Sequence, residues 1–158
     1  MKLGQNEGTV NLNLFLQGVQ GNSIANFNLF SLESFDGSKN NSTAALKRWT
    51  PENPTNDYPR ANASPMSNVF SDHQVEDGSY LRIKDVTISY DFPENMTRKF
   101  SCNALQVYIS AKNAHTFTKY SGYDPEVSRF GQNNLSMGAD YGSYPVPRLY
   151  MLGLKINF

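Results

Sequence analysis

Residues 80–92 read YLRIKDVTISYDF, and this stretch decides the fold class. Its second half alternates strictly between apolar and polar side chains. The apolar positions are Val86, Ile88, Tyr90 and Phe92, and the polar positions are Asp85, Thr87, Ser89 and Asp91. Such alternation predicts a β-strand with one apolar face and one polar face. Pro93 follows directly and predicts the end of the strand, because proline has no N–H to donate to a neighbouring strand.

Three further ranges have the same alternation. They are TVNLNLFLQGV at 9–19, LQVYISAKNAHTF at 105–117 and PRLYMLGLKINF at 147–158. Phe15 is an exception in the first range, where it falls among polar residues. The chain is therefore expected to be all-β and antiparallel.

The length of these ranges points to a membrane. Each spans about 11 to 13 residues, whereas strands of soluble proteins have about 5 to 6 and a tilted strand that crosses a bilayer has about 9 to 11. The connections are unequal, because a short segment joins the second and third ranges while residues 21–78 and 118–146 are long. Short turns at one end and long loops at the other are typical of outer-membrane barrels. The polar faces are then assigned to the barrel lumen and the apolar faces to lipid.

Composition excludes several other classes. The 158 residues carry 14 Lys and Arg against 14 Asp and Glu, and this balance argues against a nucleic-acid binder that relies on a basic surface. No apolar run reaches the roughly 18 residues of a transmembrane helix. Cys102 is the single cysteine, which excludes an internal disulfide and a cysteine-based zinc site.

Four strands do not close a membrane barrel, for which bacterial single chains use at least about eight. We therefore expect residues 1–158 to be the C-terminal fragment of a longer barrel protein, with its signal peptide and any plug domain absent from this chain. The long loops 21–78 and 118–146 are expected to be extracellular, and the C-terminus periplasmic.

Several longer motifs make the expectation more specific. They are RWTPENP at 48–54, PRA at 59–61, VEDGSYLRIKDVTISYDFP at 75–93, KYSGYDPEVS at 119–128, YGSYPVPR at 141–148 and the closing LGLKINF. Together they resemble the C-terminal end of SusC/RagA-type TonB-dependent outer-membrane transporters.

The resemblance implies a function and a set of partners. It implies about the last four strands of a 22-stranded barrel that imports glycans, oligosaccharides or peptides. The implied partners are a SusD-like surface lipoprotein that acts as a lid, the TonB complex through the missing N-terminal part, the barrel-assembly machinery and outer-membrane lipid. No enzymatic activity, cofactor or metal is implied.

Two groups of residues are predicted to make contacts. The C-terminal residues Gly153, Leu154, Ile156 and Phe158 resemble the signal that the assembly machinery reads by strand addition. Phe158 alternatively only anchors the strand at the membrane interface. The aromatic residues of the long loops either bind a ligand or the lid, or hold the loops together; they include Trp49, Tyr58, Tyr120, Tyr123, Tyr141 and Tyr144.

Catalysis finds little support in the sequence. Asp124 and Glu126 are close enough to suggest a glycosidase pair, but beside Pro125 they are better explained as turn residues. The same acids leave open a calcium site, although no EF-hand spacing is present. His73 and His115 lack a neighbouring Ser or Cys with which to form a triad.

Two alternative architectures stay open at this point. The first is a soluble β-sandwich that binds carbohydrate through the aromatic loops, since a sandwich also has two-faced strands. The second is a homo-oligomeric barrel to which each chain contributes four strands.

Overall fold

A computed structural model describes the chain except for residues 1–6, 36, 38, 62–69 and 129–136. The described residues form two compact units. The first, here named the wall unit, comprises residues up to 19 together with 80–117 and 146–158. The second, the loop unit, comprises residues 20–79 and 118–145.

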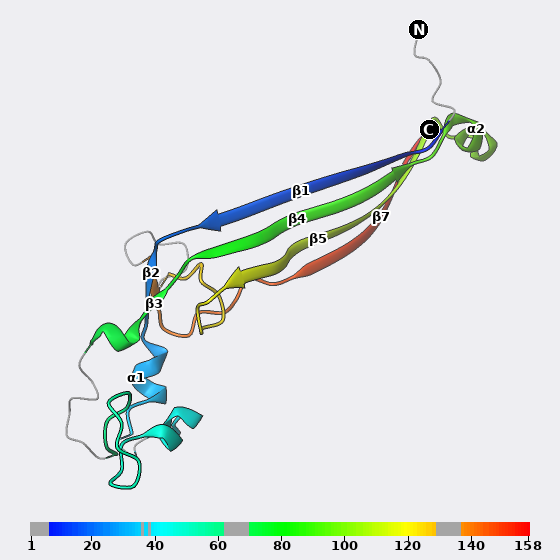
Figure 1. Ribbon diagram of the computed structural model, residues 1–158. Coiled ribbons are helices and arrows are strands. Elements are labelled where there is room, and N and C mark those ends of the chain that lie inside the picture. The colour runs from blue at the N-terminus through cyan, green and yellow to red at the C-terminus, as the bar shows by residue number, and fades with distance from the viewer. Residues whose placement is uncertain (1–6, 36, 38, 62–69, 129–136) are drawn as a thin grey trace. The chain divides into compact units, whose positions relative to one another are not determined.

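The wall unit is a four-stranded sheet (Figure 1). Its strands are β1 (Thr9–Val19), β4 (Tyr80–Asp91), β5 (Ala104–Thr118) and β7 (Leu149–Asn157), in the order β1-β4-β5-β7. β1 pairs antiparallel with β4, and β5 pairs antiparallel with β7. Each of the four alternating ranges of the sequence thus contains a strand.

In the central strands β4 and β5 the polar face is the more buried of the two, whereas the outer strands β1 and β7 are largely exposed on both faces. Side chains on the apolar face are largely exposed: Leu12 is 68% exposed, Ile109 56%, Leu152 80% and Leu154 60%. On the polar face, Ser110 is 5% exposed and Arg82 only 1%. A soluble protein buries apolar rather than polar side chains, so this sheet fits surroundings that are themselves apolar.

Hydrogen bonds between strands satisfy the polar face. The Gln106 side chain donates to Asp91 Oδ1 at 2.7 Å, and Asn11 donates to Asp91 Oδ2 at 2.7 Å. Thr87 Oγ1 lies 2.8 Å from Ser110 Oγ. These contacts join β1, β4 and β5 on one face, and the opposite face consists mainly of apolar side chains together with Tyr90 and Tyr150.

A β-bulge changes the face of the first residues of β4. The register between β1 and β4 shifts between Phe15 and Leu16, so that Gln17 lies opposite Arg82 and Leu16 opposite Ile83. Strict alternation would have placed Arg82 on the same face as Val86. A bulge inserts one extra residue, and this one returns Arg82 to the polar face, where its Nε donates to Thr116 Oγ1 at 2.9 Å.

The connection between β4 and β5 is a short helical turn. It contains α2 (Glu94–Thr97) and η4 (Arg98–Phe100), after which Ser101 has a φ of 54°. The Cys102 thiol is buried and points at the carbonyl of Thr97, 3.3 Å away. The N–H of Asn103 donates to the carbonyl of Asn157 at 2.7 Å, which joins this turn to the end of β7.

The loop unit contains regular structure that the sequence did not predict. Its sheet has the order β3-β2-β6 and consists of β2 (Ser23–Asn26), β3 (Val75–Asp77) and β6 (Ala139–Asp140). The helical turns are α1 (Asn28–Leu32), η1 (Thr43–Lys47) and η3 (Asp72–Gln74). Its core is formed by Ile24, Tyr120 and Val127. In the described part of the chain, every helix is too short or too polar to cross a membrane.

Candidate functional site

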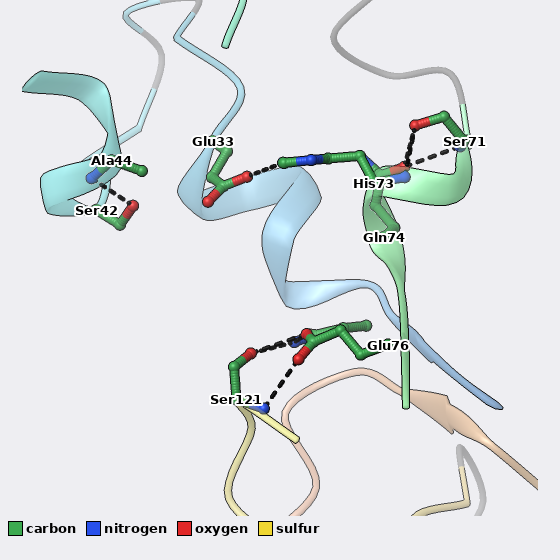
Figure 2. Close-up of polar contacts among 9 residues, drawn as sticks. Glu33, Ser42, Ala44, Ser71, His73, Gln74, Glu76 and Ser121 are labelled. Carbon is green, nitrogen blue, oxygen red and sulfur yellow. Dashed lines mark hydrogen bonds and ion pairs between the residues drawn. The ribbon is translucent and has the colours of Figure 1, made fainter. Parts of the chain in front are cut away.

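The two long loops are joined into one unit by hydrogen bonds around Glu76. This residue lies in β3, and its Oε1 accepts from Asn26 Nδ2 and from Ser121 Oγ, both at 2.8 Å. Glu76 Oε2 accepts from the backbone N–H of Ser121 at 2.9 Å (Figure 2). Because Asn26 and Glu76 belong to one loop and Ser121 to the other, a single carboxylate holds both together. Hydrogen bonds to a charged acceptor are stronger than neutral ones.

A second link is formed by Tyr120 and Asp140. The buried Tyr120 hydroxyl donates to Asp140 Oδ2 at 2.5 Å. Asp140 Oδ1 accepts from the backbone N–H groups of Gly142 and Ser143 at 2.8 and 3.0 Å. Burial raises the pKa of the Tyr120 phenol well above its usual value, and the neighbouring Asp140 carboxylate raises it further. Tyr120 is therefore protonated at neutral pH and acts as a donor.

The loop unit also contains a cavity of about 610 Å³, here named the loop cavity. This volume lies within the range of about 300 to 1,000 Å³ that ligand pockets occupy. Its lining combines aromatic rings with charged groups, including Phe35, Tyr58, Glu33, Asp57, Arg60 and His73. Rings beside carboxylate and guanidinium groups suit a ligand that carries both apolar faces and hydroxyl or amide groups.

A hydrogen bond joins two of the lining residues, which come from different parts of one loop. His73 Nε2 lies 2.6 Å from Glu33 Oε2 (Figure 2). Glu33 is the C-cap of α1, and His73 lies in η3. The Tyr58 ring stands edge-on to the His73 imidazole, with centroids 5.6 Å apart, and edge-on to Phe35 at 6.1 Å. Tyr58 thus contacts both His73 and the buried Phe35.

Local capping fixes the position of His73. Ser71 begins η3 with a capping box, in which its side chain accepts from the backbone of η3 and Gln74 accepts from the Ser71 N–H at 2.8 Å. A capping box satisfies N–H groups that the first turn leaves free. The motif S-D-H-Q at 71–74 could have been recognised in the sequence, whereas its pairing with Glu33, forty residues earlier, could not.

An aromatic cluster forms a second surface of the loop unit. Phe27 stacks on Tyr141 with ring centroids 4.3 Å apart and an angle of 8° between the planes. Phe30 and Phe70 stack on the same Phe27 ring, each at 5.6 Å. Tyr141 and Phe70 stay about half exposed. Among the six aromatic residues predicted to make contacts, Tyr141 therefore both supports the loops and presents a ring surface.

The other five predicted aromatic residues have different environments. Tyr58 lines the loop cavity, and Trp49 forms an isolated bridge with Arg60. Tyr123 and Tyr144 are 79% and 98% exposed. Tyr120 is buried in the core of the loop unit, where it stabilises the loops from within. The sequence could not distinguish these cases, because all six residues occur in irregular segments.

The C-terminal residues predicted as an assembly signal fall on both faces of β7. Leu154, Ile156 and Phe158 share the apolar face and are exposed. Gly153 lies opposite Tyr108 on the other face. A Cβ atom at position 153 would overlap the Tyr108 ring, so this glycine makes room for an aromatic side chain. The reading of these four residues by the assembly machinery stays a prediction.

The acidic pair has the turn geometry expected from the sequence. Asp124 Oδ1 accepts from the backbone N–H of Glu126 at 2.9 Å, which is the hydrogen bond of an Asx turn. Over the described residues, no three His, Cys, Asp or Glu side chains gather in an arrangement that would hold a metal ion.

Comparisons with known proteins agree with these features. No protein-family model matches the chain. It is 35% identical over 151 residues to TonB-dependent receptor P3 of Formosa agariphila, covering 93% of this chain and 15% of the relative. It is 30% identical over 97 residues to TonB-dependent receptor SusC of Bacteroides thetaiotaomicron, covering 60% of this chain and 9% of the relative.

Solved structures give the same result. The chain superposes on the RagAB peptide importer in its closed-closed state with a TM-score of 0.79 and 26% identity, covering 94% of this chain and 16% of that one. The open-open state gives a TM-score of 0.77. The chain thus spans about a sixth of the length of the chains it matches.

Fold and comparisons together define a class of protein, because a two-faced antiparallel sheet with this similarity is a segment of a transmembrane β-barrel wall. Within that class, the chain belongs to the SusC/RagA-type TonB-dependent receptors. The resemblance seen in the sequence is thereby confirmed, as is the all-β fold class. Such receptors are outer-membrane proteins and not enzymes, as expected.

Proposed function

We propose that this segment contributes wall strands and outer loops to an outer-membrane transporter that imports glycans, oligosaccharides or peptides. The observation that carries the proposal is the burial pattern of the sheet, whose apolar face is exposed while Arg82 and Ser110 are buried. In hydrocarbon that apolar face is favourable, and the polar face lines the lumen. The similarity to TonB-dependent receptors and to a peptide importer supports a function in import.

The topology of the segment follows from its connections. Residues 20–79 leave the end of β1 and return at the start of β4, while only residues 92–103 join β4 to β5. In barrels of this kind the long loops are extracellular and the short turns periplasmic. The loop unit is therefore assigned to the cell exterior, and Phe158 to the periplasmic side.

Partners are assigned on the same basis. The similarity to SusC and to a RagAB importer supports a SusD-like lipoprotein that closes over the loops, and energy input from the TonB complex through another part of the transporter. Affinity purification of the complete transporter tests the lipoprotein assignment. We expect one surface lipoprotein to co-purify stoichiometrically, and its absence after crosslinking in intact cells would contradict the assignment.

We further propose that the loop cavity contacts the imported substrate or the lid. Tyr58 and the hydrogen-bonded Glu33 and His73 provide an aromatic edge and polar groups inside a cavity of ligand size. The capping box of η3 holds the lining residues Ser71 to Gln74 in place before any ligand arrives, which lowers the entropic cost of binding.

Growth and uptake measurements test both proposals. Deleting the gene of the complete transporter should abolish growth on one nutrient out of a panel of purified glycans and peptides. With that nutrient, Tyr58→Ala should raise the half-saturating concentration for uptake about tenfold. This is the change expected for losing about 1.4 kcal/mol of binding free energy. Leu46→Ala is the matched control, because Leu46 is a 79% exposed residue of the same unit that does not line the loop cavity. Equal uptake by both variants would show that the loop cavity does not contact the substrate or the lid. The proposed transport function would be unaffected by that result.

The soluble β-sandwich finds less support in the structure. A sandwich buries one face of each sheet against a second sheet. The strands described for the wall unit form one sheet, and its apolar side chains Leu12, Leu152 and Leu154 remain exposed.

A further inference from the structure

A shallow apolar groove lies on the wall unit where the turn between β4 and β5 meets the end of β7. We name it the rim groove. Its volume is about 280 Å³, and its lining consists of Phe100, Cys102, Leu105, Ile156 and Phe158. Cys102 is buried, whereas Phe100, Ile156 and Phe158 are 65%, 42% and 87% exposed. The groove thus has a buried floor and open aromatic sides.

The rim groove opens on the apolar face of the sheet. Leu105 lies opposite Ile156 in the register of β5 and β7, and Phe158 follows Ile156 at the spacing that returns to the same face. Ile109 and Leu152 continue this face along the two strands, also as opposite partners. The groove is therefore continuous with the surface that the fold exposes to hydrocarbon.

The walls of the groove are held in place by backbone hydrogen bonds. The N–H of Cys102 donates to the carbonyl of Thr97 at 3.1 Å, and the N–H of Asn103 donates to the carbonyl of Asn157 at 2.7 Å. Thr97 is 2% exposed. A groove formed by a fixed turn differs from the flat strand surface around it, because it surrounds an occupant on several sides.

Two basic residues precede Phe100 in the same turn. Arg98 pairs with Glu94 across an exposed 3.2 Å contact, and Lys99 is exposed. Within the described residues, no hydrogen bond or ion pair of the Lys99 ammonium is found. Basic side chains beside interfacial aromatic residues attract anionic lipid headgroups.

We propose that the rim groove is a binding site for one phospholipid. One acyl chain lies against Phe100, Leu105 and Phe158, and the phosphate group faces Lys99 and Arg98. Continuity with the lipid-facing surface supports the acyl chain as the occupant, and the charge of the turn supports an anionic headgroup. The site goes beyond the proposed transport function, because its occupant is a membrane lipid rather than the imported substrate.

Native mass spectrometry of the complete transporter tests this site. The protein would be purified in detergent with added phosphatidylglycerol, and retained lipid counted per molecule. We expect Phe100→Ser to retain one lipid fewer or to bind it about tenfold more weakly. Phe117→Ser is the matched control, since Phe117 is an exposed aromatic residue of β5 that does not line the groove. An unchanged count for Phe100→Ser, or an equal loss in both variants, would overturn the proposal.

Two further measurements identify the occupant and the headgroup. A photoreactive benzoylphenylalanine in place of Phe100 should form an adduct with the mass of a phospholipid in native membranes. An adduct with a protein segment would show that another chain or strand fills the groove, and would overturn the proposal. Lys99→Gln should weaken phosphatidylglycerol binding by about threefold and weaken phosphatidylcholine binding less, because choline offsets the charge of the phosphate. Unchanged binding of both lipids would contradict the phosphate contact.

Discussion

Single residues decide which way the strands of the wall unit face. Arg82 is an example, because the alternation of residues 80–92 places it on the apolar face and only the bulge opposite Phe15 and Leu16 moves it to the polar side. A bulge depends on pairing between strands far apart in the sequence, so alternation within one strand could not reveal it. The positions beyond the bulge, such as Thr87 and Ile88, follow the alternation and were predictable.

Gly153 gives a test at this scale. The Gly153→Val variant would force the Tyr108 ring away from β7, and overpacking of this kind costs about 1 to 3 kcal/mol. We expect the complete barrel to unfold at a lower temperature, measured by the loss of its compact form on heating in detergent.

Repeating the Gly153→Val substitution in a Tyr108→Ser variant distinguishes an effect on side-chain packing from an effect on recognition by the assembly machinery. In the presence of Tyr108→Ser the ring is gone, so Gly153→Val should cost much less, as a double-mutant cycle would show. If Gly153→Val is equally harmful with and without the ring, Gly153 acts through recognition by the assembly machinery rather than through packing.

Tyr120 gives a second residue-level prediction, which concerns pH. Its pKa is raised in the folded protein above the unfolded value of about 10. The stability that it contributes is therefore complete below about pH 10 and is lost as the pH rises above that value. Protease cleavage within the loops should accelerate between pH 9 and 11, and Tyr120→Phe should flatten this dependence. A wild-type rate that does not change with pH would contradict the assigned hydrogen bond to Asp140.

At the scale of elements, the loop unit departs most from what the sequence predicts. β2 and β6 are four and two residues long, and they pair in parallel although more than a hundred residues separate them. Segments so short carry no alternation that could be recognised. The four wall strands were predictable, because each repeats the apolar and polar pattern many times. The loop aromatic residues were recognised as a group, but their division into core, cavity and surface depends on this small sheet.

Glu76 provides the test of the loop unit as an element. Glu76→Gln replaces one of two accepting oxygens by a donor and removes the charge that Asn26 and Ser121 contact. Because Glu76 is only partly buried, loss of this acceptor is expected to cost about 1 kcal/mol. We expect faster proteolysis within both residues 20–79 and 118–145, with the wall strands still protected.

The matched control for this variant is Glu52→Gln, which changes the same charge in the same unit at an exposed position. Its proteolysis rate should equal that of the wild type. Acceleration confined to one of the two loops in Glu76→Gln would mean that the carboxylate does not join them.

At the scale of the whole molecule, the chain has too few strands to bury its own surface. Its outer strands β1 and β7 each have one edge outside the described sheet. Exposed edges and a large apolar face promote aggregation in water. Residues 1–158 expressed alone are therefore expected to aggregate without detergent, as judged by sedimentation. A folded, soluble monomer with a cooperative melt would favour the carbohydrate-binding sandwich, and a stable detergent-soluble oligomer would favour a barrel made from several copies.

The facing of the wall strands is tested most directly by a pair of arginine substitutions in the complete transporter. Leu152→Arg places a charge on the exposed apolar face, where it costs about 2 to 4 kcal/mol at the middle of a bilayer. Gln106→Arg places the same charge on the hydrogen-bonded polar face. The measurement is the amount of folded transporter in outer membranes. We predict a strong loss for Leu152→Arg and near wild-type assembly for Gln106→Arg, and equal assembly of the two variants would contradict the membrane-wall account.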